Sequence, residues 1–278
     1  MRVFDCFPLF NELDLLELRL NELWHVVDVF VIVEARQTFT GNSKPLNFAE
    51  NEARFAKYLP KIRYLTLDAF PEGMSNWGKE EYQRNWLKRG LTDAKPDDVV
   101  ILSDLDEIPR AEAVQRIVQK GIRHREVYCL SLAWYQYYMN VDVKVRWERQ
   151  GPRLVCAGDV GRIYALRRIL APTKGFLRNL IRQIKSSRVM NLWLRRILVQ
   201  DAGWHFTWMG GAEAIALKGS SIPTHSHLQE GPKTTSWAKQ RLAAALDNPD
   251  GYEIVELDDS FPRFVRDNTE LFAKYILA

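Results

Sequence analysis

The chain has 278 residues, of which 46% are apolar and 27% are charged, and its formal net charge is +4. This composition is ordinary for a soluble globular protein of one large or two small domains. Three widely spaced cysteines exclude a cysteine-rich zinc site and favour a reducing compartment. The N-terminus lacks the apolar core of a signal peptide, and no apolar run approaches the roughly 20 residues of a membrane span. We therefore expect a cytoplasmic protein, either free or peripheral at the inner face of a membrane.

Predicted strands and helices alternate up to residue 140. Asn11 can cap the first helix, whose apolar face is formed by leucines at regular helical spacing. The strands are expected at 2–10, 28–35, 62–70, 99–102 and 126–139 (one strand or a pair), and the helices at 11–27, 50–59, 76–94 and 111–121. This order predicts an α/β fold with a Rossmann-like, mostly parallel central sheet flanked by helices.

The stretch "DDVVILSDLDEIPR", residues 97–110, joins a buried strand to three carboxylates. Asp104, Asp106 and Glu107 follow the apolar run directly. Ligands bind at this edge of an open α/β sheet. Neighbouring carboxylates repel each other, and a bound cation with hard oxygen ligands, magnesium or manganese, relieves that repulsion. A solvated acidic turn before the next helix is the alternative.

Other candidate residues lie at strand ends and loops. Glu34 ends its own strand. In "GGAEA", Glu213 lies in a first helical turn, where the helix dipole favours its ionised form, so it can act as a general base or simply be a favourable first-turn acid. His225 and His227 are possible metal ligands in a loop. Further candidates, each equally explained as a packed or surface residue, are His205, Trp204, Trp208 and Arg84.

Residues 160–200 hold ten basic residues and no acidic residue, so the rest of the chain is net negative. Within this segment, Phe176, Leu177, Leu180, Ile181 and Ile184 share one face of a predicted helix. Arg178, Arg182 and Lys185 fall on another face. This pattern is typical of a helix that binds an anionic membrane surface. A core-packed helix with a solvated basic face is the alternative, and we expect no nucleic-acid partner because nothing else resembles such a module.

Taken together, these motifs resemble glycosyltransferase family 17, whose animal members are β-1,4-N-acetylglucosaminyltransferases. The matching stretches span almost the whole chain: "VFDCFPLFNELDLLELRLNEL", "FVIVEARQTFTGNSKPL", "EEYQRNWLKRGL", "DDVVILSDLDEIP", "AGWHFTW" and "FPRFVRDNTELFAKYI". The pair "SDLDEIP" and "GWHFTW" is more specific than an isolated Asp-x-Asp.

The resemblance implies a GT-A glycosyltransferase fold, a UDP-sugar donor (UDP-N-acetylglucosamine is expected), a divalent metal and inversion at the anomeric carbon. It implies metal ligands at Asp104, Asp106 and His227, with His225 and His205 as the alternatives to His227, and a catalytic base at Glu213. For the donor it implies Glu34, Arg84, Asp104 and Glu107, and for the acceptor Trp204, His205 and Trp208. Animal members carry a membrane anchor, which this chain does not show. The expected acceptor is therefore a microbial or viral glycan, or a lipid-linked saccharide.

We expect one catalytic domain over 1–278, with a nucleotide-sugar half at 1–140 and an acceptor half at 141–278 that includes the basic segment 160–200. Two other classes stay open. A sugar nucleotidyltransferase shares the fold and the Asp-x-Asp, but usually has a glycine-rich basic loop after the first strand, where this chain reads "FPLFNELDLL". A non-enzymatic membrane-surface or nucleic-acid binder would use the basic segment and leave the carboxylates without a role.

Overall fold

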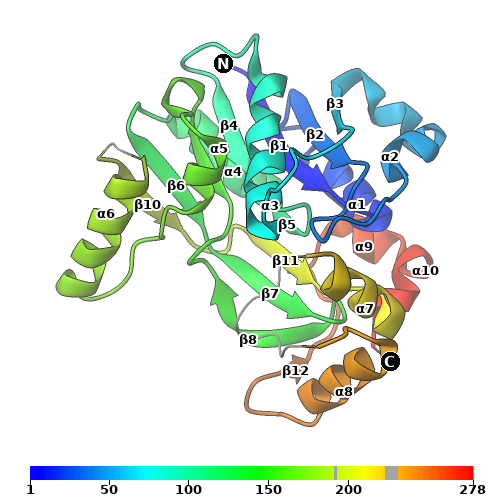
Figure 1. Ribbon diagram of the computed structural model, residues 1–278. Coiled ribbons are helices and arrows are strands. Elements are labelled where there is room, and N and C mark those ends of the chain that lie inside the picture. The colour runs from blue at the N-terminus through cyan, green and yellow to red at the C-terminus, as the bar shows by residue number, and fades with distance from the viewer. Residues whose placement is uncertain (191–192, 223–230, 278) are drawn as a thin grey trace.

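Two β-sheets organise the chain in the computed structural model (Figure 1), which describes residues 1–190, 193–222 and 231–277. The strands are β1 (Val3–Leu9), β2 (Val29–Ala35), β3 (Ile62–Leu67), β4 (Val99–Leu102), β5 (Glu107–Pro109), β6 (Glu126–Leu130), β7 (Leu132–Gln136), β8 (Val141–Trp147), β9 (Arg153–Cys156), β10 (Arg195–Val199), β11 (Gly203–Thr207) and β12 (Glu253–Ile254). The α-helices are α1 (Leu13–Leu23), α2 (Asn47–Glu50), α3 (Asn76–Trp86), α4 (Ala111–Lys120), α5 (Ile163–Arg167), α6 (Phe176–Met190), α7 (Gly211–Ser221), α8 (Thr235–Leu246), α9 (Arg263–Asp267) and α10 (Thr269–Phe272).

The larger sheet has seven strands in the order β10-β6-β9-β4-β1-β2-β3. Its neighbours run parallel except at β9, which is antiparallel to both β4 and β6. The predicted α/β class with a mostly parallel central sheet is therefore confirmed.

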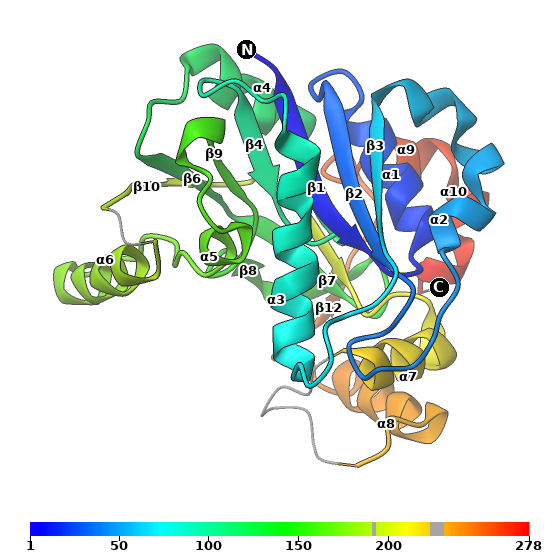
Figure 2. The same cartoon turned by 45° about the horizontal axis from the view of Figure 1, so that its top comes forward.

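Helices cover both faces of this sheet because successive strand residues point to opposite sides. Phe7, Phe30 and Ile101 face one core shared with α1 and α4. Phe4 and Val100 face a second core shared with α5 and the turn after α3. Figure 2 shows α3 on the near face of the sheet and α1 behind it. Burial on both faces explains why the strands read as continuous apolar runs.

The smaller sheet has the order β12-β8-β7-β11-β5 and packs on the other side of α1. Leu16 and Leu20 of α1 pack against the large sheet, whereas Leu15 and Leu18 pack with residues of β5, β7 and β11. One helix thus joins the two cores.

Several local expectations were wrong. Asn11 does not cap α1, since Glu12 occupies that position without a side-chain bond. The helix expected at 50–59 is a 3₁₀ helix over Glu52–Lys61, which contains Pro60, a residue without an amide hydrogen. The helix expected to reach residue 94 ends at Trp86 and continues as a 3₁₀ helix to Leu91, where Gly90 packs so closely on Val31 that a side chain there would collide.

The division into halves at residue 140 does not coincide with the sheets. β9 and β10 return to the large sheet, whereas β5 and β7 belong to the small one. The functional roles of the two halves remain predictions. No helix of the described residues is long and apolar enough to cross a membrane.

Candidate active site

Asp104 and Asp106 lie in the turn between β4 and β5. β4 ends at Leu102 and runs parallel to β1, so the turn lies at the carboxyl edge of the large sheet. This is the edge at which open α/β sheets bind ligands.

Arg19 of α1 holds this turn in shape from the protein interior. Its guanidinium donates to the carbonyl oxygens of Asp104 at 2.9 Å and Glu107 at 2.8 Å, and to Ser103 Oγ at 2.6 Å. The Asp5 carboxylate of β1 accepts two further bonds from Arg19, at 2.7 and 2.6 Å, and both side chains are fully buried. A buried arginine that is paired with β1 and donates three bonds to the turn rigidifies the backbone that carries the two aspartates.

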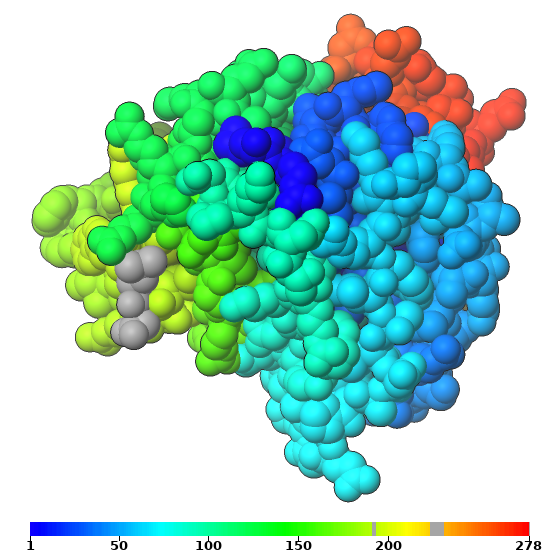
Figure 3. Space-filling model, turned by 90° about the horizontal axis from the view of Figure 1, so that it is seen from above, coloured from blue at the N-terminus to red at the C-terminus, as the bar shows by residue number. Residues whose placement is uncertain are grey.

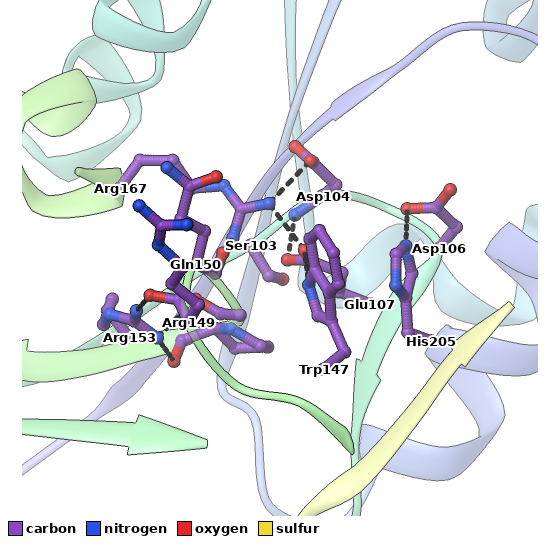
Figure 4. A network of polar contacts seen from close by, with 12 residues as sticks. Ser103, Asp104, Asp106, Glu107, Trp147, Arg149, Gln150, Arg153, Arg167 and His205 are labelled. Atoms are coloured by element: carbon purple, nitrogen blue, oxygen red, sulfur yellow. Dashed lines mark hydrogen bonds and ion pairs between the residues drawn. The ribbon is translucent and has the colours of Figure 1, made fainter. Parts of the chain in front are cut away.

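Glu107 was predicted to contact the donor, but the structure places it in the interior. Its Oε1 accepts from Trp147 Nε1 at 2.6 Å and from Arg167 Nη2 at 2.5 Å, and its Oε2 accepts from the amide of Asp104 at 3.1 Å (Figure 4). The side chain is fully buried. We therefore correct its assignment: Glu107 positions Arg167 and the turn, and does not face a ligand.

Asp104 is held between two arginines. Its Oδ1 accepts from Arg84 Nη1, and its Oδ2 accepts from Arg167 Nη2 at 2.8 Å. Desolvation alone would raise the pKa of the Asp104 carboxyl, but the guanidinium groups of Arg167 and Arg84 hold that pKa far below its usual range. Asp104 is therefore ionised at neutral pH, and 31% of its side chain remains exposed.

Arg84 lies at the predicted position beside the acidic turn. The side chain is buried and is also bonded to Glu80 at 3.0 Å, which excludes the alternative of a surface arginine. Its contact with a donor phosphate remains a prediction.

Asp106 is paired with Lys218 of α7. Asp106 Oδ2 accepts from Lys218 Nζ at 2.8 Å, and the same ammonium lies 3.1 Å from Glu12 Oε1. Burial disfavours the charged form of Lys218, but Asp106 and Glu12 outweigh that effect and raise its pKa. Asp106 Oδ1 lies 3.7 Å from His205 Nε2 and has no donor within hydrogen-bond distance among the described residues. One carboxylate oxygen at this site is thus available to a further ligand.

His205 of β11 lies beside Asp106, as Figure 4 shows, with its ring 4.6 Å from that of Trp147 and 6.0 Å from that of Trp134. Burial lowers the pKa of His205, so its imidazole is neutral at neutral pH. Its Nδ1 has no hydrogen-bond partner among the described residues. A buried histidine of this kind is placed next to the acidic turn and not on an open acceptor surface.

The two predicted acceptor tryptophans differ. Trp204 is buried, packs with Phe206 in the core of the small sheet and donates from Nε1 to the Ser260 carbonyl at 2.9 Å, so its assignment to the acceptor was wrong. Trp208 is partly exposed near α7, with its ring 6.3 Å from that of Trp237. Of the two tryptophans, only Trp208 has an exposed surface, and its contact with an acceptor remains a prediction.

Glu34, predicted to contact the nucleotide, is fully buried. Its Oε1 accepts from Lys44 Nζ at 2.8 Å and from the amide of Asn47 at 2.6 Å, and its Oε2 accepts from the amide of Phe48 at 3.0 Å and from Tyr64 Oη at 2.8 Å. The structure therefore corrects this assignment as well: Glu34 anchors the loop before α2 to the sheet.

Glu213 lies in the first turn of α7 after Gly210 and Gly211, which both have positive φ angles, as the predicted tight turn requires. It is exposed and makes no hydrogen bond or ion pair with the described residues. A cavity of about 200 Å³ lies beneath this end of α7 and is lined by Glu12, Gly210, Ala214 and Lys218, among others. α7 therefore carries one residue that touches the acidic turn and one free carboxylate at its exposed end.

Three of the four carboxylate oxygens of Asp104 and Asp106 accept from cationic side chains, which leaves one oxygen for a divalent metal ion. Carboxylate oxygens are hard ligands, and Asp106 Oδ1 lacks a donor in the described part of the chain. The predicted ligand His227, with His225, lies outside the described residues. Elsewhere in the described chain, His124, Cys156 and Asp159 come within 4.8 Å of one another at the opposite end of β4, but burial raises the pKa of the Cys156 thiol to about 11, which disfavours a thiolate ligand.

Sequence reasoning missed five residues that build the site: Arg19, Glu12, Trp147, Arg167 and Lys218. Arg19 had a detectable signal, because it is a charged residue at core spacing between Leu16 and Leu23. Arg167 was counted only as part of the basic segment. For Lys218, nothing in the spacing indicates Asp106, more than 100 residues away.

The comparison with known protein families bears on the residues just described. The family model of glycosyltransferase family 17 matches residues 1–150, which include the whole acidic turn, Arg19 and Arg84. This chain belongs to glycosyltransferase family 17. The resemblance inferred from the motifs is thereby confirmed. The match ends before Arg167, Lys218 and Glu213. The structure places Arg167 and Lys218 at the acidic turn, whereas the role of Glu213 remains a prediction from the sequence.

Three curated relatives share this likeness over a longer stretch. Proteins from Rattus norvegicus, Homo sapiens and Mus musculus, each named β-1,4-mannosyl-glycoprotein 4-β-N-acetylglucosaminyltransferase, are 28% identical to it over 233 residues. The aligned region covers 78% of this chain and 42% of each relative. The chain thus spans less than half the length of these family members.

Proposed function

We propose that this protein is an inverting GT-A type glycosyltransferase, which moves N-acetylglucosamine from UDP-N-acetylglucosamine to a saccharide or lipid-linked saccharide acceptor. The observation that carries the proposal is the acidic turn at the carboxyl edge of the sheet, where three cationic side chains surround two aspartates. Carboxylates with arginine and lysine groups at one strand edge form a site for a diphosphate. We choose N-acetylglucosamine as the transferred sugar because the relatives are named N-acetylglucosaminyltransferases.

Asp106, with Asp104 beside it, would hold the divalent metal, and the metal would offset negative charge on the departing UDP. Arg84 and Arg167 are already fixed on Asp104, so their positive charge is in place beside the turn before a donor binds. The chain's own contribution to the donor is therefore a rigid, positively charged surface around one acidic turn.

The acceptor would approach from the side of α7. Glu213 is the group that we assign as general base, because it is exposed, ionisable and free of partners in the described structure. It lies in the first turn of α7, at the end of the helix that also carries Lys218. Attack by the activated hydroxyl on the face opposite UDP would invert the anomeric carbon, and the partly exposed Trp208 could pack on the acceptor sugar.

The test is a donor panel with purified protein. UDP-N-acetylglucosamine, UDP-N-acetylgalactosamine, UDP-glucose and GDP-mannose are each incubated with Mn²⁺ or with EDTA, and nucleotide release and thermal stabilisation are measured. We expect release of UDP from UDP-N-acetylglucosamine above the other donors, and only with Mn²⁺.

A parallel reaction supplies UTP and N-acetylglucosamine 1-phosphate and measures pyrophosphate. Pyrophosphate formation without UDP release from any donor would show a nucleotidyltransferase and overturn the proposal. Release that is equal for all donors would overturn the assignment of the sugar.

A further inference from the structure

The helix α6 is oriented with its apolar side toward solvent. Phe176, Leu177 and Ile181 are 80%, 70% and 53% exposed, and Leu180 and Ile184 on the same side are exposed as well. Figure 1 shows α6 at the edge of the molecule beyond β10, and Figure 3 shows the yellow-green segment that includes it at the rim. A core-packed α6 with a solvated basic face, the alternative that the sequence left open, does not hold.

The opposite side of α6 is polar and attaches the helix to the protein by hydrogen bonds. Gln183 Nε2 donates to the Leu194 carbonyl at 2.8 Å, and Ser186 Oγ accepts from the amide of Leu170 at 3.1 Å. Arg196 of β10 donates to Gln183 Oε1 at 2.6 Å and to Asn179 Oδ1 at 2.7 Å. Gln183 and Ser186 are the buried residues of this helix. The polar contacts therefore fix which face is turned outward.

Free positive charge borders the exposed apolar side. Arg178, Lys185 and Arg188 of α6 are exposed and form no ion pair with the described residues, and Lys174 precedes the helix in the same condition. Most other basic residues of the segment serve the fold: Arg167 binds the acidic turn, Arg196 binds α6 and Arg162 pairs with Glu81. Arg168, in contrast, is exposed and forms no ion pair with the described residues. The free charges are thus concentrated on the helix that exposes its apolar face.

We propose that α6 docks on the surface of an anionic lipid bilayer, with Phe176, Leu177 and Ile181 inserted at the headgroup boundary and Arg178, Lys185 and Arg188 among the lipid phosphates. Apolar insertion and basic contact with an anionic leaflet are the two terms that hold an interfacial helix. A second copy of this chain fits less well as occupant, because the same basic side chains would face each other across the contact.

Membrane docking at α6 would also position the candidate active site. α5 directly precedes the segment that leads to α6, and its last residue, Arg167, contacts Asp104. A protein bound to the membrane through α6 would therefore hold the candidate site in a fixed orientation relative to the lipid surface. This inference is independent of the sugar chemistry and can fail or hold without it.

The experiment is co-sedimentation with vesicles of phosphatidylcholine alone or of phosphatidylcholine with phosphatidylserine. We expect binding to the anionic vesicles only, and weaker binding as salt rises. Combined Arg178→Gln, Lys185→Gln and Arg188→Gln should weaken binding on the order of 100-fold, since each charge contributes to the attraction. Combined Leu177→Ser and Ile181→Ser should weaken it more than tenfold through lost insertion.

Matched control variants distinguish binding through α6 from nonspecific binding of the protein to vesicles. Arg116→Gln, Lys120→Gln and Lys239→Gln remove the same charge from exposed helical sites elsewhere, and Val145→Ser with Ile254→Ser removes apolar side chains of similar exposure. The controls should bind like the wild type, and all variants should keep its melting temperature. Binding that is equal for both vesicle types, absent from both at low salt, or weakened as much by the controls as by the α6 variants would overturn the proposal.

Discussion

Lys218, Arg84 and Arg167 neutralise the carboxylates whose mutual repulsion first indicated a bound cation. The sequence correctly placed two aspartates at a strand edge, but it assigned the balancing charge to a metal alone. The structure shows that much of that charge comes from the chain itself. A metal ion at Asp106 would therefore share this carboxylate with the ammonium group of Lys218.

The stability of a Lys218→Met variant should therefore depend on divalent metal ions. Without divalent ions, the variant leaves Asp106 buried and without its cation, and we expect its free energy of unfolding to fall by about 1–3 kcal/mol. Mn²⁺ should then raise the melting temperature of the variant more than that of the wild type, since the metal can neutralise Asp106 in place of the ammonium.

The matched control is Lys239→Met, an exposed lysine of α8 without an ion pair among the described residues. Its melting temperature should follow the wild type with and without Mn²⁺. If Mn²⁺ raises the melting temperature of the wild type and of the Lys218 variant equally, then Asp106 binds no metal or Lys218 does not compete with the metal.

Glu213→Gln should retain donor binding and lose transfer. A general base acts on the acceptor hydroxyl and is typically worth about 10²–10⁴-fold in rate. Transfer rates and UDP binding are measured side by side, with Glu270→Gln as control because Glu270 is also an exposed acid in a first helical turn. A rate within a few-fold of the wild type would move the catalytic base to another residue.

The misassigned residues share one cause. Glu34 and Glu107 are acidic residues near strand ends, as is Asp104, which remains a site residue, and sequence alone does not distinguish the three. Which of them faces solvent depends on tertiary partners, namely Tyr64 for Glu34 and Trp147 for Glu107. Spacing predicts where acids gather but not which carboxylate has its oxygens occupied by the protein.

At the scale of elements, periodicity predicted the strands β1 to β4, β6 and β7 and the helices α1, α3, α4 and α6, but it did not predict β8 to β12 or which residues fix the orientation of α6. α6 has the expected amphipathic pattern, yet its hydrogen-bonding side faces the protein. The reason lies in Arg196 and Leu194, which offer polar partners that no local pattern of residues 176–190 could indicate. Similarly, the segment at 126–139 divides at Ser131 into strands of two different sheets.

The docking of the C-terminal segment on α1 should depend on pH through Asp14. Asp14 accepts from Tyr275 Oη at 2.7 Å and pairs with Lys274 at 2.7 Å and Arg54 at 2.6 Å. Burial opposes its ionisation, but the bonds from Lys274, Tyr275 and Arg54 outweigh burial and lower the pKa of Asp14. A lowered pKa in the folded state adds stability above the unfolded value of about 3.9, and this stability is lost as pH falls through the folded value.

Asp14→Asn should consequently lower the free energy of unfolding by about 1–3 kcal/mol at pH 7. The difference in free energy of unfolding between the wild type and Asp14→Asn should narrow as pH falls from 5 to 3, because the Asp14 carboxyl is protonated first in the unfolded chain. Denaturant midpoints at pH 7, 5 and 3 give the comparison, with the exposed Asp267→Asn as control. A gap that stays constant over this range would mean that the Asp14 charge does not stabilise the C-terminal segment.

At the scale of the whole molecule, the sequence predicted the fold class and the edge of the sheet that carries the site. It could not predict that β9 and β10 return to the large sheet, because such long-range pairing leaves no local pattern. This return brings Arg167 of α5 to Asp104, 63 residues away along the chain. The site is therefore a property of the complete topology and not of residues 1–140 alone.

The central claim is that the turn carrying Asp106 binds a nucleotide diphosphate together with a divalent metal. Calorimetric titration of UDP into the wild type and Asp106→Asn, with Mn²⁺ and with EDTA, tests it most directly, and the exposed Asp68→Asn serves as control. We predict binding by the wild type and the control only with Mn²⁺, and none by Asp106→Asn, which should keep its folded circular dichroism spectrum. Equal UDP affinity of the wild type and Asp106→Asn, with an unchanged metal requirement, would contradict the claim.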